Sequence, residues 1–110
     1  MRDQRERLLD ILEAIDRIER YAARGQAAFE SDELIQTWII HHLEIVGEAA
    51  AKLGRDFHEQ HPEIPWPQLV AMRNLLVHEY FGVDLGEVWE VIERDLPVLK
   101  RLIKEMEQTV

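Results

Sequence analysis

The stretch Arg73-Asn74-Leu75-Leu76-Val77-His78-Glu79-Tyr80 places a guanidinium, an imidazole and a phenol within an otherwise apolar run. At about 100° per residue, a helix brings Arg73 and Tyr80 onto one stripe of its surface. Asn74 and His78 share the next stripe, one turn apart, so the amide can reach and orient the imidazole. The spacing therefore predicts a helix that carries its polar groups on two adjacent stripes.

Arg73 is bracketed by apolar residues on both sides, and an unpaired charge within an apolar arc is very costly. We expect it to have an acidic partner or to line a cleft. Glu48, on the preceding expected helix, either pairs with Arg73 or faces solvent. A purely structural interpretation also stays open, with Arg73 as a buried ion-pair anchor, His78 as a cap at the helix end and Tyr80 as a core aromatic.

Outward from this stretch, apolar residues recur at three- and four-residue spacing. The expected helices cover residues 2–24, 32–53, 67 to 80 or 81, and 85–108. Gly25 and Gly54 end the first two helices, and Asp32 is a good N-cap for the second. Pro97 should kink or break the last helix near residues 94–96. We expect an all-α fold, an antiparallel four-helix bundle in which residues 1–110 form a single domain.

The composition narrows the class of protein. The chain has 110 residues, no cysteine and a formal charge of −9. The lack of cysteine excludes disulfides and favours a reducing cytoplasm, and no apolar run approaches the roughly 20 residues that span a bilayer. We therefore expect a cytoplasmic protein with no membrane partner. The net negative charge argues against nucleic-acid binding over the whole surface, so RNA would need a local positive site. A basic protein could dock elsewhere, on the acidic surface.

Two patterns resemble fragments of metal sites. His41 and Glu44 have the spacing of half a site, but no further ligands are evident, and a solvated or dimer-facing stripe is favoured. His58-Glu59-Gln60-His61 is one residue short of the zinc motif H-E-x-x-H, and Pro62 disrupts a helix there. We expect no metal and no cofactor.

The pattern Arg-x4-His-x-Tyr, with Asn directly after the Arg, resembles the signature of HEPN-domain proteins of the HepT-like toxin family. The flanking sequence agrees with it over nearly the whole chain. The agreeing segments are Pro65-Trp66-Pro67, Ile45-Val46-Gly47-Glu48-Ala49, Val88-Trp89 and Pro97. The resemblance implies a HEPN-like helical fold and a homodimer with a composite site.

An arginine and a histidine without a metal suit the cleavage of RNA, because the substrate supplies its own nucleophile, the 2′-OH. His78 would act as general base or acid, and Arg73 would clamp the phosphate. DNA lacks the 2′-OH and is not a substrate by this route. One chain supplies one histidine, and Arg73 and His78 point about 140° apart on one helix. Two chains with their third helices side by side would provide a complete site.

For the partner, the resemblance implies a minimal nucleotidyltransferase antitoxin. In that family the antitoxin can transfer AMP to the motif tyrosine, here Tyr80. A phosphate added near Arg73 would occupy the guanidinium and block the cleft. The prediction is thus a ribonuclease toxin with catalytic residues Arg73 and His78, supported by Asn74, Glu48 and Tyr80.

Two alternatives belong to different classes. The first is a non-catalytic helical subunit that binds a nucleotide, or presents a substrate, to a nucleotidyltransferase; the acidic surface favours it over a stand-alone RNA binder. The second is a dimeric interaction module without chemistry, against which the polar residues in the apolar arc argue. An activity assay separates these hypotheses.

Overall fold

The computed structural model describes residues 3–78 and 82–110, and this part of the chain contains helices but no strand. The helices are α1 (Gln4–Ala22), α2 (Gln26–Ser31), α3 (Glu33–Lys52), α4 (Arg55–Gln60), α5 (Trp66–His78), α6 (Leu85–Glu90), the π-helical segment η2 (Val91–Asp95) and α7 (Leu96–Glu107). The expected all-α class is confirmed. None of these helices is long and apolar enough to cross a membrane.

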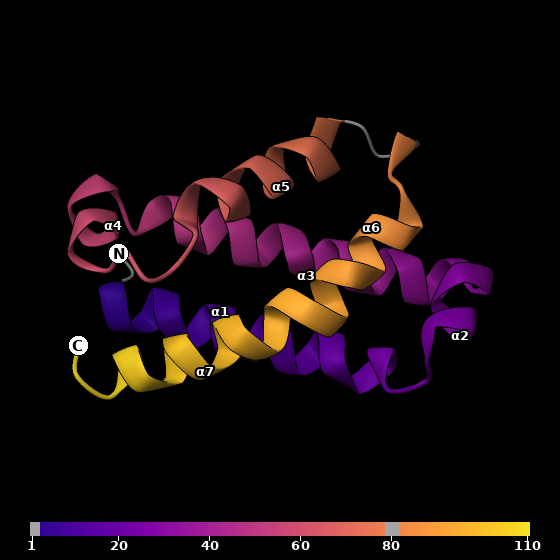
Figure 1. Cartoon of the computed structure of the whole chain (residues 1–110), viewed down its shortest axis with the longest axis horizontal. Coiled ribbons are helices and arrows are strands. Elements are labelled where there is room, and N and C mark those ends of the chain that lie inside the picture. The colour runs from indigo at the N-terminus through magenta and orange to yellow at the C-terminus, as the bar shows by residue number, and fades with distance from the viewer. Residues whose placement is uncertain (1–2, 79–81) are drawn as a thin grey trace.

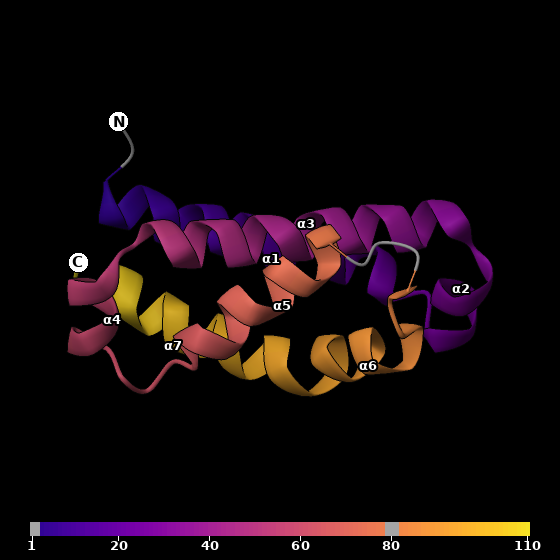
Figure 2. The same cartoon turned by 90° about the horizontal axis from the view of Figure 1, so that it is seen from above.

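The long helices α1 and α3 lie side by side along the length of the molecule (Figures 1 and 2). α7 packs on α1, and α5 packs on α3. Figure 2 shows α5 crossing α3 obliquely. This oblique helix carries most of the candidate site.

Aspartate side chains set three of the helix starts. Asp3 accepts a hydrogen bond from the Glu6 backbone N–H at 2.8 Å, and Asp84 accepts one from the Gly86 backbone N–H at 2.8 Å. Asp32 accepts from the backbone N–H of Leu34 at 2.9 Å, as its position before the expected helix predicted. Each carboxylate satisfies donors that have no partner within the helix.

Two short helices were not expected. α2 and α4 lie between the helices expected from the sequence, and each buries one phenylalanine, Phe29 and Phe57. Six residues are too few to show a helical period, so a single apolar anchor leaves no pattern to recognise. Gly25 and Gly54 precede these helices with φ of 95° and 88°, which explains the glycine at both turns.

The break expected near Pro97 is present in an unexpected form. The chain stays helical, but the turn before Pro97 widens into the π-helical segment η2 over Val91–Asp95. Proline has no N–H and crowds the carbonyl four residues earlier, and the widened turn accommodates both effects. The C-terminal end of the third expected helix, at Tyr80 or Phe81, lies outside the described residues.

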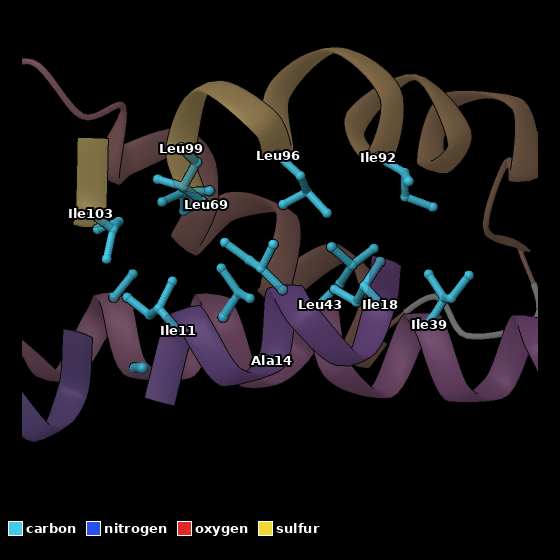
Figure 3. Close-up of a cluster of buried hydrophobic side chains, with 14 of the residues drawn as sticks. Ile11, Ala14, Ile18, Ile39, Leu43, Leu69, Ile92, Leu96, Leu99 and Ile103 are labelled. Atoms are coloured by element: carbon cyan, nitrogen blue, oxygen red, sulfur yellow. The ribbon is translucent and has the colours of Figure 1, made fainter. Parts of the chain in front are cut away.

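The core lies between α1, α3 and the α6–α7 arm. Figure 3 shows side chains of α1 and α3 pointing toward those of η2 and α7. The labelled residues are Ile11, Ala14, Ile18, Ile39, Leu43, Leu69, Ile92, Leu96, Leu99 and Ile103. A cluster of ion pairs lies at the edge of this core. The Lys100 ammonium is 2.6 Å from a carboxylate oxygen of Glu19 and 3.1 Å from a carboxylate oxygen of Asp16. These carboxylates raise the pKa of Lys100 above its usual value.

Candidate functional site

The site begins with a close approach of two helix backbones. A Cβ added to Gly47 in α3 would lie 2.3 Å from Cβ of Arg73 and 2.9 Å from the carbonyl oxygen of Leu69, both in α5. No real side chain tolerates these distances, so a glycine is required if α5 is to rest where it does. Gly47 thereby determines how close the stem of Arg73 lies to α3.

The Arg73 guanidinium reaches past Gly47 to Glu48. Its Nη1 lies 3.4 Å from Glu48 Oε2, so the ion pair considered from the sequence is present. The separation is long for a charge-assisted hydrogen bond, and the Glu48 side chain is 49% exposed. Such a pair is worth less than about 1 kcal/mol, so a stronger anion can displace Glu48.

Arg73 also has a donor without a hydrogen-bond partner in the described part of the chain. Its Nε is buried and has no hydrogen-bond partner among the described residues. A buried N–H without a partner is costly, and at native sites it calls for an explanation. The stem of Arg73 packs at Gly47, and the guanidinium beyond it has one long ion pair and a buried Nε, so its charge is only partly compensated.

The apolar arc that brackets Arg73 in the sequence is not buried throughout. Of its apolar neighbours, Leu69 and Leu76 are buried, but Val77 is 50% exposed and Leu75 is 48% exposed. Arg73, 26% exposed, lies at the border between the buried and exposed faces of α5. It therefore lines an open surface.

The other predicted residues are only partly described. Asn74 is exposed, one turn before His78, which is the last residue of α5. The side chain of His78 and the whole of Tyr80 lie outside the described residues. The predicted contact of Asn74 with the imidazole and the roles of His78 and Tyr80 stay predictions.

The pattern His58-Glu59-Gln60-His61 has a structural explanation in the fold. His58 donates through Nε2–H to the carbonyl of Ala50 at 2.7 Å and stacks on the buried ring of Trp66. Trp66 donates its indole N–H to the carbonyl of His61 at 2.9 Å. Over residues 3–78 and 82–110, no three His, Asp or Glu side chains gather as metal ligands would.

Sequence reasoning gave no individual role to two residues, Gly47 and His42. Glycine inside a helix is costly, so its presence there signals a close contact. His42 is 3% exposed, and its Nδ1–H donates to the Trp38 carbonyl at 2.7 Å. Burial lowers its pKa below the ordinary value, and His41 and Arg17 lower it further, against the opposing hydrogen bond to Trp38. The spacing of His41 and Glu44 favoured the exposed neighbour His41 instead of His42.

Comparisons with known proteins agree with the resemblance noted from the sequence. The family model described as "Ribonuclease HepT-like" matches residues 11–106. "Probable ribonuclease HepT" of Thermococcus cleftensis is 41% identical over 102 residues, which are 90% of this chain and 91% of that protein. A Methanocaldococcus jannaschii protein provisionally named as an RNase is 38% identical over 104 residues, 94% of this chain and 95% of that protein.

One relative is longer. A second M. jannaschii protein, whose name joins gamma-glutamylcyclotransferase with a provisional RNase, is 41% identical over 100 residues, 89% of this chain and 45% of that protein. This chain therefore spans about half of that relative. No solved structure matches the chain significantly.

The family model extends from the middle of α1 to the end of α7, and it includes Gly47, Glu48, Arg73 and His78. The resemblance noted from the Arg-x4-His-x-Tyr pattern is thus confirmed over the whole described helical core. The chain belongs to the ribonuclease HepT-like family.

Proposed function

We propose that this protein is a metal-independent endoribonuclease and the toxin of a toxin–antitoxin pair. The observation that carries the proposal is Arg73, whose stem packs against Gly47 at the edge of an open helix face and whose Nε has no partner among residues 3–78 and 82–110. The relatives named as ribonucleases supply the reaction class.

The chemistry requires proton transfer and charge stabilisation alone. The 2′-oxygen of RNA attacks the adjacent phosphorus as its proton passes to a base, the P–O5′ bond breaks, and the leaving oxygen takes a proton from an acid. A 2′,3′-cyclic phosphate and a 5′-hydroxyl result. His78 performs the proton transfers, and Arg73 exchanges its weak pairing with Glu48 for the phosphate oxygens.

A homodimer completes the site, because one chain offers only one motif histidine. Leu75 and Val77 leave about half of their side-chain surface in contact with solvent on α5. Apolar side chains on the same helix as a functional arginine suit contact with a second copy. Two α5 helices would then bring two Arg73 and two His78 side chains to one cleft. Sedimentation should find a dimer at micromolar concentration, and a monomer would remove the composite site.

Neutralisation would come from a nucleotidyltransferase partner. The Tyr80 hydroxyl attacks the α-phosphorus of ATP, pyrophosphate leaves, and the tyrosine carries AMP. The new phosphate diester introduces negative charge near Arg73 and competes with RNA. Co-expression with the partner should add one or more adenylyl groups by intact mass. Tyr80→Phe should escape the addition and stay at least partly active. A silenced protein with unmodified Tyr80 would instead mean steric masking.

A second candidate is a non-catalytic subunit that binds a nucleotide for a nucleotidyltransferase. The formal charge of −9 favours it, because a strongly acidic chain repels RNA outside a local site. Arg73 would then receive the phosphate of a nucleotide, and no cleavage would follow.

Cleavage of RNA in EDTA by purified protein separates the two candidates. Arg73→Ala should reduce kcat/KM about 10²- to 10³-fold, and His78→Ala about 10²- to 10⁴-fold. Arg101→Ala is the matched control, since Arg101 is exposed on α7 and distant in sequence from the motif. Wild-type rates in both Arg73→Ala and His78→Ala, or activity restored only by a divalent ion, would reject the proposed reaction.

A further inference from the structure

A pocket that Arg73 does not line lies between the last turn of α1 and the first half of α3. Its volume is about 570 Å³. Figures 1 and 2 show these ends of α1 and α3 next to α2. Six of its lining residues carry polar or aromatic groups: Tyr21, Arg24, Asp32, Thr37, Trp38 and His41. None of them has a role in the reaction proposed above.

The aromatic wall of the pocket is preformed. The indole N–H of Trp38 donates to the carbonyl of Arg17 at 2.9 Å, which holds the ring in one orientation. Tyr21 packs edge-on against it, with ring centroids 5.2 Å apart and planes at 63°. Trp38 is only partly buried, whereas Trp66 and Trp89 are 2% and 6% exposed. A fixed, accessible indole binds planar ligands at low entropic cost.

Arg24 forms the charged side of the pocket. Its guanidinium lies over the Tyr21 ring, 5.1 Å from the centroid, and within the part of the chain that the structure describes it pairs with no carboxylate. Asp32 is engaged as the N-cap of α3, so its charge is partly neutralised by backbone N–H groups. Thr37 and His41 are exposed at the rim, where they can accept or donate hydrogen bonds.

This combination fits a nucleobase. Unpaired bases bind proteins by stacking on aromatic rings and on arginine guanidinium planes, with hydrogen bonds to their edges. A base is uncharged, so a protein of charge −9 does not repel it from the pocket. The backbone phosphate attached to its sugar would meet Arg24.

The pocket lies on the same helix as Glu48, the partner of Arg73. His41 at the rim and Glu48 are seven residues apart on α3, so they share one helix face and are about 10 Å apart along the axis. We propose that the Tyr21–Arg24–Trp38 pocket binds an unpaired base of the RNA whose phosphate Arg73 holds. This inference rests on the proposed ribonuclease function for the identity of the strand, while base recognition itself does not depend on it.

Tryptophan fluorescence tests base binding directly, because Trp38 is the accessible indole. The probes are AMP and a single-stranded RNA oligonucleotide with 2′-O-methyl groups, which cannot be cleaved. Stacking on Trp38 should quench part of the emission with both probes. The oligonucleotide should bind more tightly if the base belongs to RNA, and equally tight AMP binding would identify a free nucleotide as the source.

Substitution at Arg24 gives the quantitative test. Arg24→Gln should weaken oligonucleotide binding about tenfold, since stacking and phosphate contact are both reduced. Arg20→Gln is the control, because Arg20 is exposed on the same helix and does not line the pocket. Both residues are exposed, so both variants should fold. Trp38→Leu, with folding verified by circular dichroism, should abolish the quenching.

The outcomes separate this inference from the function on which it rests. Emission that does not change with either probe, together with equal oligonucleotide affinities of Arg24→Gln and Arg20→Gln, overturns the base site even if RNA is cleaved. Quenching that Trp38→Leu removes, in a protein that cleaves no RNA, upholds the base site and rejects the ribonuclease function.

Discussion

α1 and α5 both pack along α3, but they do so by opposite means. α1 buries a continuous apolar stripe in which Leu8, Ile11, Ile15 and Ile18 have no solvent exposure. α5 approaches through Gly47 and leaves Leu75, Val77 and part of Arg73 accessible. The contact with α1 stabilises the fold, and the contact with α5 positions a charged group at an open surface. Stability and function are therefore expected to separate between the two sides of α3.

The largest expected effect on stability is on the α1 side. Ile15→Ala removes a fully buried side chain and should lower the free energy of unfolding by about 2–5 kcal/mol. The rate of RNA cleavage per folded molecule should not change, because Ile15 lies on α1, whereas the helix that carries Arg73, α5, packs on α3. Urea denaturation and active-site-normalised kinetics measure the two quantities. A large loss of specific activity in the folded fraction would show that stability and function do not separate between the two sides of α3.

Gly47→Ala should affect both stability and activity. The added methyl group must displace Arg73 or the backbone of α5, which should cost about 1–3 kcal/mol and should reduce RNA cleavage strongly. Gly86→Ala in α6 is the control, since its Cβ would meet only Asp84 Oδ1 at 3.2 Å. Equal stabilities and equal rates for the two variants would show that the close approach at Gly47 is not required.

His42, in α3, should make the free energy of unfolding depend on pH. Burial lowers its pKa in the folded protein below 6.5, so the unfolded chain binds a proton first as the pH falls. This contribution to stability is complete above about pH 6.5 and is lost as the pH falls from there through the folded pKa. His42→Gln should flatten the unfolding free energy between pH 7.5 and 5.5, and His41→Gln, at an exposed position, should not. An unchanged slope in His42→Gln would assign the dependence to other groups.

Glu48→Gln should have the smallest effect. The Arg73–Glu48 pair is long and half exposed, so its loss should change stability by less than about 1 kcal/mol. Because the carboxylate competes with phosphate for the guanidinium, KM for RNA should fall severalfold at low salt. A rise in KM, or a loss of kcat beyond tenfold, would mean that Glu48 takes part in the chemistry.

The sequence predicted the long helices well because apolar residues recur along 12 to 20 positions in each. The short helices α2 and α4 were not predicted because each buries a single residue, Phe29 or Phe57, and so shows no helical period of apolar residues. Arg73, Asn74 and Glu48 were identified from spacing and charge, and the Arg73–Glu48 pair is present. Spacing along one helix cannot show how closely a second helix approaches, and for this reason the role of Gly47 emerged only from the packing.

Product analysis of RNA cleaved in EDTA tests the proposed reaction most directly. The substrate is a single-stranded RNA with one 2′-deoxy residue placed at a mapped cleavage position. The account predicts cleavage at unmodified positions without divalent ions, 2′,3′-cyclic phosphate ends, and no cleavage 3′ of the deoxy residue. Cleavage at that residue, or activity that requires a divalent ion, would contradict it.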